Sequence, residues 1–201
     1  MHPNPAFRAD DDASMLRWAA EIGFAHILIV TRDGPMAVHA PIVAAGERAV
    51  RFHIARGNRA FNHLDGAATI ASVAGANGYI TPNWYANAAS QVPTWNYLAV
   101  ELQGTAHAID EDGLVDQLDA LAKTHEPRVI PDNPWTRDKM DEARFRTMLG
   151  AIAGFEIAVT SVRATRKLSQ NKPAADRARV IAGLDQGGNH LLADAMRRVA
   201  P

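Results

Sequence analysis

Three short apolar runs joined by tight turns constrain the fold of this chain more than any other feature. The runs are Phe24–Thr31, Met36–Ala44 and Arg48–Ala55, and the turns between them are Asp33-Gly34 and Gly46-Glu47. An Asp-Gly dipeptide between β-branched runs is a strong hairpin signal. Turns this short join antiparallel strands, because a parallel pair needs a crossover of a dozen or more residues. The segment therefore predicts an antiparallel meander.

The rest of the chain supplies further strands with helices between them. We predict strands at Ala68–Val73, Gly78–Thr81, Thr94–Ile109 and Phe155–Val162, and helices at Asp11–Ile22, Gly57–Leu64, Gly113–Lys123, Arg137–Gly150, Ala175–Leu184 and Asn189–Val199. Gly104, in the middle of a strand, indicates a bend or a close backbone approach. Hairpins with peripheral helices favour a closed or split antiparallel barrel over βαβ units. We expect a single domain, residues 1–201, ending in a helical segment at about 173–199.

The composition excludes several classes of protein. The chain has 201 residues, 47% of them hydrophobic, and its net charge of −1 supplies no basic field for nucleic acid or anionic lipid. No stretch approaches the ~20 apolar residues of a membrane span, and the first residues show no apolar core of a secretory signal. Cysteine is absent, which excludes disulfides and thiolate chemistry. We expect a cytoplasmic protein without a membrane partner.

Aromatic, proline and asparagine residues are concentrated in two segments, 78–85 and 92–97, of a chain that is only 6% aromatic. Rigid rings beside amide groups suit a planar polar ligand, because the rings cover its faces and the amides bond its edges. The alternative is a corner of the core in which Tyr and Trp are buried with their polar tips satisfied.

Two polar segments are candidates for gripping a phosphate. Arg56 to Arg59 lies where a strand ends and a helix is predicted to begin; a helix N-terminus, a glycine, an amide and two arginines form a competent phosphate cradle. The alternative is a solvated basic turn. Lys167 to Lys172 combines cations, a hydroxyl and two amides just beyond a strand. Its alternative is a polar loop before the helix that Pro173 begins.

The sequence contains no standard catalytic or metal-binding motif. It has no HExxH, GxSxG, GxGxxG or Walker pattern. His39 and His53 are predicted to share a strand pair, and face either a ligand or the rim of the core. The acidic run Asp110-Glu111-Asp112 is interpreted as a helix-capping turn rather than a metal site. We therefore predict no metal and assign no catalytic residue.

Taken in order, several strings of residues resemble the PaiB family of FMN-binding split-barrel proteins, which are commonly labelled negative transcriptional regulators. The strings are Arg56-Gly57-Asn58, Tyr79 to Tyr85, Val92 to Tyr97, His125-Glu126, Pro134-Trp135, Gly154-Phe155-Glu156 and Lys167 to Asn171. The match extends to about Leu184. It departs from the family pattern in the short loop Ala86–Gln91, which lacks an expected lysine, and at Lys172, where arginine is usual.

The resemblance implies a mainly β, six-stranded antiparallel split barrel with peripheral helices, a homodimer, and an FMN at the subunit interface. By analogy with the similar pyridoxamine-phosphate-oxidase superfamily, the segment after the third strand holds the flavin phosphate, and a C-terminal segment contacts the flavin from the other side. The cofactor-binding residues predicted in this way are Arg56, Asn58, Arg59, Thr94, Trp95, Lys167, Ser169 and Gln170.

Three interpretations of function remain open. A flavin carries redox chemistry itself, so the first is an FMN-binding sensor or redox protein, including an oxidoreductase acting on an unknown small molecule. The second is a direct DNA-binding repressor, but the two central helices are separated by far more than the 3–4-residue turn of a helix-turn-helix. We therefore predict no direct sequence-specific DNA binding. The third is a barrel that has lost its ligand.

Overall fold

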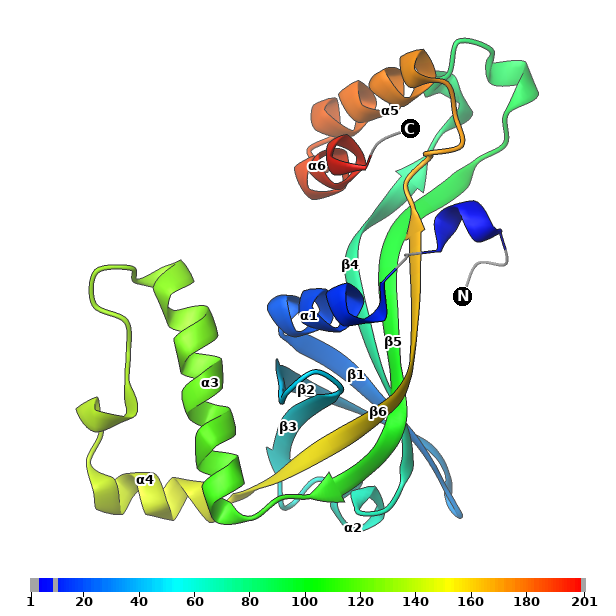
Figure 1. Ribbon diagram of the computed structural model, residues 1–201. Coiled ribbons are helices and arrows are strands. Elements are labelled where there is room, and N and C mark those ends of the chain that lie inside the picture. The colour runs from blue at the N-terminus through cyan, green and yellow to red at the C-terminus, as the bar shows by residue number, and fades with distance from the viewer. Residues whose placement is uncertain (1–3, 9–10, 200–201) are drawn as a thin grey trace. The chain divides into compact units, whose positions relative to one another are not determined.

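Six strands close into an antiparallel barrel in the computed structural model, which describes residues 4–8 and 11–199 (Figure 1). Around the ring their order is β1-β2-β3-β6-β5-β4. The strands are β1 (Phe24–Thr31), β2 (Gly34–Ala44), β3 (Ala49–Ala55), β4 (Ala68–Ile80), β5 (Thr94–Ala108) and β6 (Ile152–Lys167). The predicted mainly β fold class and the N-terminal meander are confirmed.

Helices lie between and after the strands. They are α1 (Asp12–Ile22), α2 (Phe61–Leu64), α3 (Glu111–Val129), α4 (Glu142–Leu149), α5 (Ala174–Gln186) and α6 (His190–Arg198). Four short 3-10 turns accompany them: η1 (Pro5–Phe7), η2 (Pro82–Trp84), η3 (Ala88–Ser90) and η4 (Arg137–Lys139). Asp110 begins α3 by accepting a hydrogen bond from the Gly113 amide at 2.8 Å, which confirms the predicted capping role of the acidic run.

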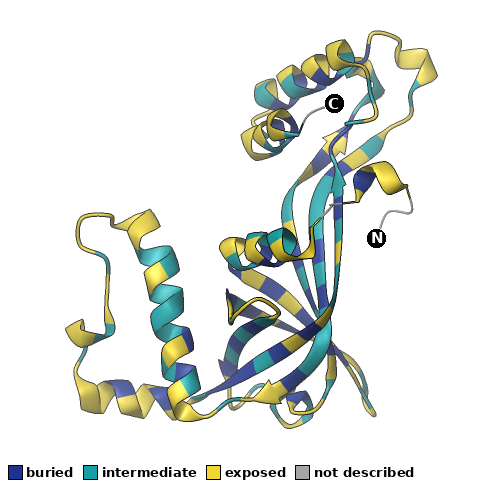
Figure 2. Ribbon diagram, viewed as in Figure 1, coloured by how far each residue is buried: buried dark blue, intermediate teal, exposed yellow. Residues whose placement is uncertain are grey.

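Buried residues alternate with more exposed ones along the strands (Figure 2). In β1, Ala25, Ile27 and Ile29 are buried, whereas Phe24, His26, Leu28 and Val30 are exposed. This period of two is what a strand with one face on the core requires. It gives the barrel an apolar interior, and it leaves several large apolar side chains of β1 on the outer face.

Two strands predicted separately, at 68–73 and 78–81, form the single strand β4. The intervening residues Ala74-Gly75-Ala76-Asn77 have low β propensity, and pairing within the barrel overrides that local preference. In the predicted helix at 137–150, Met140 is extended and Asp141 caps a new helix by accepting from the Arg144 amide at 2.9 Å. The prediction of one helix there was wrong, and a 3-10 turn precedes α4.

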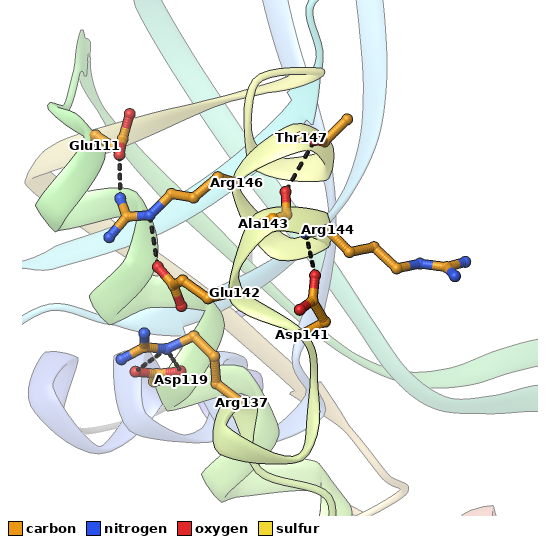
Figure 3. A network of polar contacts seen from close by, with 9 residues as sticks. All are labelled: Glu111, Asp119, Arg137, Asp141, Glu142, Ala143, Arg144, Arg146 and Thr147. Atoms are coloured by element: carbon orange, nitrogen blue, oxygen red, sulfur yellow. Dashed lines mark hydrogen bonds and ion pairs between the residues drawn. The ribbon is translucent and has the colours of Figure 1, made fainter.

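The chain forms two compact units, one comprising residues 12–73 and 101–162, which we call the barrel unit, and the other residues 1–11, 74–100 and 163–201, which we call the C-terminal unit. In the barrel unit, one ion pair joins α3 to α4 and another joins α3 to the 3-10 turn η4 (Figure 3). Arg146 of α4 contacts both Glu142 and Glu111, and Arg137 donates to Asp119 at 3.1 Å. Leu114 of α3 and Phe145 and Leu149 of α4 form a buried apolar cluster.

The core of the C-terminal unit lies between the end of β4 and the two terminal helices. Leu168, Val180, Leu184, Leu192 and Met196 are among its buried members. Arg177 is also buried, and its Nη2 donates to the carbonyl oxygens of Met196 and Val199 at 2.7 and 2.6 Å. These carbonyls belong to the C-terminal turn of α6, so a cation satisfies groups that a helix end leaves unpaired.

The two histidines predicted to share a strand pair lie on the paired strands β2 and β3, but they are not opposite each other. His39 of β2 lies directly opposite His26 of β1, whereas His53 of β3 lies opposite Gly154 of β6. The β2–β3 register explains the difference, because it pairs Ile42 with Phe52. His53 points to α3, where its Nδ1 is 3.0 Å from the side-chain amide of the buried Gln117.

Burial of His53 predicts a pH dependence of stability. Desolvation lowers the pKa of its imidazole, so the unfolded chain takes up a proton more readily than the folded one. The contribution of neutral His53 to the free energy of unfolding is therefore fully present above the ordinary histidine pKa of about 6.5, and it is lost as the pH drops below that value. Thermal melts from pH 8 to pH 5 should show a smaller decrease for His53→Gln than for the unmodified protein. His107→Gln, at an exposed position, should retain the full decrease; equal slopes in all three proteins would refute this role.

Candidate functional site

The segment Arg56 to Ala60 is a hydrogen-bonded turn rather than the first turn of a helix. The Asn58 side-chain oxygen accepts from the Ala60 amide at 2.9 Å, and the Asn58 amide donates to the Ala55 carbonyl at 2.9 Å. This arrangement delays the start of α2 to Phe61, which corrects the predicted helix at Gly57–Leu64. Asn58 therefore shapes the turn, and the turn fixes where its two arginines point.

Arg59 lies at a groove on the barrel unit with a volume of about 920 Å³. Of the described residues that line the groove, Arg59 is the only charged one. Apolar lining comes from β1, β2 and β4, including Leu28, Met36 and Ile70, while Gln103, Thr105 and Thr160 supply uncharged polar groups. The volume and the mixture of apolar walls with a few polar groups are typical of a small-molecule site.

Arg56 belongs to a different cavity, of about 360 Å³. Its Nε donates to the Gly150 carbonyl at 3.1 Å, and its guanidinium lies 5.7 Å from the centre of the Phe61 ring. Three carboxylates line the same cavity, those of Asp65, Asp110 and Glu111. An anion would meet these acids there, so this cavity is a poor phosphate site. The structure thus separates the two arginines that the sequence treats as one cradle.

Asn96 and Ser169 form a buried polar contact in the C-terminal unit. Asn96 is 1% exposed, and its Nδ2 donates to Ser169 Oγ at 2.9 Å. Its Oδ1 has no hydrogen-bond partner among the described residues. Ser169 has φ of 57°, the only positive value at a described non-glycine residue. An orphaned buried acceptor beside a strained backbone is a pattern that clusters at functional sites.

Lys167 and Thr94 lie beside each other in the same unit. The Lys167 ammonium donates to Thr94 Oγ1, and burial lowers the pKa of this lysine. β6 ends at Lys167, so the predicted position of this cation just beyond a strand is nearly right. The contact fixes the ammonium at one end of the strand, where it supplies a positioned donor.

The two aromatic segments divide between core and surface. Tyr85 is buried and Trp84 packs against the core of the C-terminal unit, as the core-corner alternative predicts. Trp95 is half exposed, donates from Nε1 to Asn77 Oδ1 at 3.2 Å, and lies edge-on to Tyr79 with ring centres 6.4 Å apart. The pair Tyr79 and Trp95 is therefore the part of the cluster that is open to a ligand.

Gln170 has a structural role. Its Oε1 accepts from the Leu168 amide at 2.8 Å, and its Nε2 donates to the carbonyls of Ala6 and Arg166. Both amide hydrogens are thus used within the chain, which leaves none for a flavin.

The predicted residues fall into two sets, each assembled within its own unit. Arg59 at the groove belongs to the barrel unit; Thr94, Trp95, Lys167 and Ser169 belong to the C-terminal unit. Asn96 belongs to the Val92–Tyr97 motif but is not among the residues predicted to bind the cofactor. The groove residues Gln103, Thr105 and Thr160 are not among them either. The alternation along β5 is the signal that places Gln103 and Thr105 on the same face of the strand.

Among the helices described, none is long and apolar enough to cross a membrane. Within residues 4–8 and 11–199, no group of three or more acidic, histidine or cysteine side chains is placed to hold a metal ion.

Comparison with known proteins gives consistent likenesses. A family model described as a putative FMN-binding domain matches residues 1–161. The protease synthase and sporulation protein PAI 2 of Bacillus subtilis (strain 168) is 28% identical over 187 residues, which cover 91% of this chain and 88% of that protein.

Solved structures show the same fold at low sequence identity. A FAD and heme binding protein from Mycobacterium smegmatis has a TM-score of 0.60 at 19% identity, covering 85% of this chain and 78% of its own. A conserved hypothetical protein from Mycobacterium tuberculosis has a TM-score of 0.61 at 11% identity, covering 86% and 94%. The barrel is therefore of the split-barrel class that includes flavin-binding proteins.

The chain belongs to the family of putative FMN-binding domains, since the family model spans most of its length. This confirms the predicted family, and with it a flavin as the cofactor.

Proposed function

We propose that the protein binds FMN in the groove of the barrel unit, with Arg59 donating to the phosphate, and that it acts as a flavin-dependent sensor or redox protein. One observation carries the placement: Arg59 is the only charged residue among the described residues lining the groove. A phosphate monoester has about −1.5 to −2 charge at pH 7. A chain with a net charge of −1 must meet that charge with a local cation.

The remaining lining suits the rest of the flavin. Leu28, Met36 and Ile70 offer apolar surface to the ring system, and Gln103 and Thr105 offer donors and acceptors for its polar edge. The flavin itself supplies the redox chemistry. The chain's role is to bind and orient it and to limit its contact with water.

In a homodimer, the predicted residues of the C-terminal unit would reach the flavin bound by the other subunit. The family resemblance implies an FMN at a subunit interface, so Thr94, Trp95, Lys167 and Ser169 would contact the flavin from the second copy. A second subunit would also cover exposed apolar side chains that line the groove, such as Val30, which is 83% exposed. Light scattering at micromolar concentration should give twice the chain mass of 21.7 kDa. A monomer under these conditions would refute the dimer.

We propose neither direct recognition of DNA nor binding to a membrane. The chain's near-zero net charge gives no phosphate-tracking surface, and the stretch between α3 and α4 is much longer than a helix-turn-helix turn. We place the protein in the cytoplasm, where regulation would act through its flavin. Nanomolar, steeply salt-dependent binding to its own upstream DNA would overturn this.

The proposed function is tested by purifying the protein and titrating it with FMN. We expect flavin absorbance in the visible spectrum, or a melting temperature that rises with FMN concentration by mass action. Riboflavin at the same concentrations should raise it less, because it lacks the phosphate. Absence of both the absorbance and the shift would favour a barrel without its ligand.

A further inference from the structure

We propose that His26 and His39 together chelate a divalent transition-metal ion on the outer face of the barrel. The two residues are direct cross-strand partners in the β1–β2 register. Both side chains are exposed, and their ring centres are 4.8 Å apart with an interplanar angle of 86°. Two adjacent imidazoles on a rigid strand pair provide two of the ligands that such ions prefer.

The spacing of the rings fits chelation. A zinc ion lies ~2.1 Å from an imidazole nitrogen, which is itself about 1.2 Å from the ring centre, so two ligands at a roughly tetrahedral angle have centres about 5.4 Å apart. The observed separation is 4.8 Å, which is shorter by about 0.6 Å. Rotation of the exposed side chains about their terminal torsion, which is broad for histidine, is then enough to aim one nitrogen of each ring at a common point.

The surroundings leave both imidazoles available. Among residues 4–8 and 11–199, neither ring has a hydrogen-bond or ion-pair partner, and the rings of His39 and Phe24 lie edge-on to that of His26. The outward-facing neighbours along the two strands, such as Leu28 on β1 and Pro41 on β2, are uncharged. Ser72, which lies opposite His26 on β4, is uncharged as well. No cation in this register repels a metal ion.

The class of ion follows from the ligands. Imidazole suits zinc, copper and nickel, whereas magnesium and calcium prefer oxygen ligands. Because the described residues include no group of three ligands, two imidazoles leave coordination positions open. Water fills these positions if one ion binds per chain, and a second copy of the chain fills them if one ion binds per two chains. The chelate by His26 and His39 is common to both cases.

Titration calorimetry with zinc ions tests the proposal. We expect the unmodified protein to bind zinc, and His26→Gln and His39→Gln each to weaken binding at least tenfold. The matched controls are His107→Gln, at an exposed position on β5, and His2→Gln, which lies outside the described residues. Both controls should bind as the unmodified protein does. A loss of affinity in a control as large as in the two variants would overturn the proposal, as would unchanged binding in His26→Gln and His39→Gln.

A measurement on the unmodified protein covers the case in which a variant fails to fold. Paramagnetic copper ions, added in substoichiometric amounts, should broaden the ring-proton resonances of His26 and His39 before those of the other histidines. Uniform broadening of all histidine resonances would contradict a chelate at this position. The measurement does not require FMN, so its outcome is independent of the flavin proposal.

Discussion

Replacing Arg59 by alanine is expected to weaken FMN binding about 10- to 100-fold, because a charged hydrogen bond to the phosphate is worth roughly 1.5–3 kcal/mol. Arg59 is the only charged residue among the described residues lining the groove, so no other side chain described there can replace its charge. Quenching of FMN fluorescence during a titration with protein gives the dissociation constant. Riboflavin binding should change little, since the missing interaction involves the phosphate.

Two further variants make the test specific. Arg56→Ala removes a guanidinium of the same turn that is held by Gly150 and Phe61 beside three carboxylates. It should leave FMN affinity within about twofold, the effect of an ordinary surface substitution. Arg59→Lys should recover part of the affinity, because the charge returns without the planar fork. If Arg56→Ala weakens FMN as much as Arg59→Ala, both arginines hold the phosphate, as the sequence first suggests.

The strand meander could be predicted because its signals are local. Asp33-Gly34 and the alternation in Phe24–Thr31 mark the β1–β2 hairpin without reference to the rest of the chain, and β1 has the predicted bounds. β4 was predicted as two pieces, since the pairing that joins them comes from distant residues. The same holds for β6, which extends from Ile152 to Lys167 beyond the predicted Phe155–Val162.

The site could be predicted only as a set of residue types. The sequence places Arg56 and Arg59 three positions apart, and nothing local shows that they line different cavities. That difference arises from the Asn58 hydrogen bonds and from the carbonyl of Gly150, which is 94 residues away in the sequence. Gln170 illustrates the same limit, because its amide is engaged with Ala6, at the opposite end of the chain.

Gly104→Ala is expected to cost about 3 kcal/mol of folding stability or more, and to lower the melting temperature by about 6–12 °C. A Cβ atom at this position would lie 2.0 Å from the carbonyl oxygen of Ala158 on β6. Backbone atoms of a neighbouring strand cannot move aside as the end of a flexible side chain can, so the strands must separate locally. The mid-strand glycine predicted to mark a close approach does so.

The matched control is Gly57→Ala, where an added Cβ meets no atom within 4 Å and the glycine does not have a positive φ. Its melting temperature should rise by about 1–4 °C, because removing a glycine without strain lowers mainly the entropy of the unfolded chain, which stabilises the fold by roughly 0.4–1 kcal/mol. Thermal unfolding of both variants at one pH, without flavin, separates the effect on packing from the effect of ligand binding.

An equal and small change in both would show that β5 and β6 can separate at Gly104 without loss of stability. The close approach would then be a consequence of the small residue and not a requirement of the barrel. A large loss at Gly104 alone would establish the opposite: the barrel closes at this point only because one of its strands carries no side chain there.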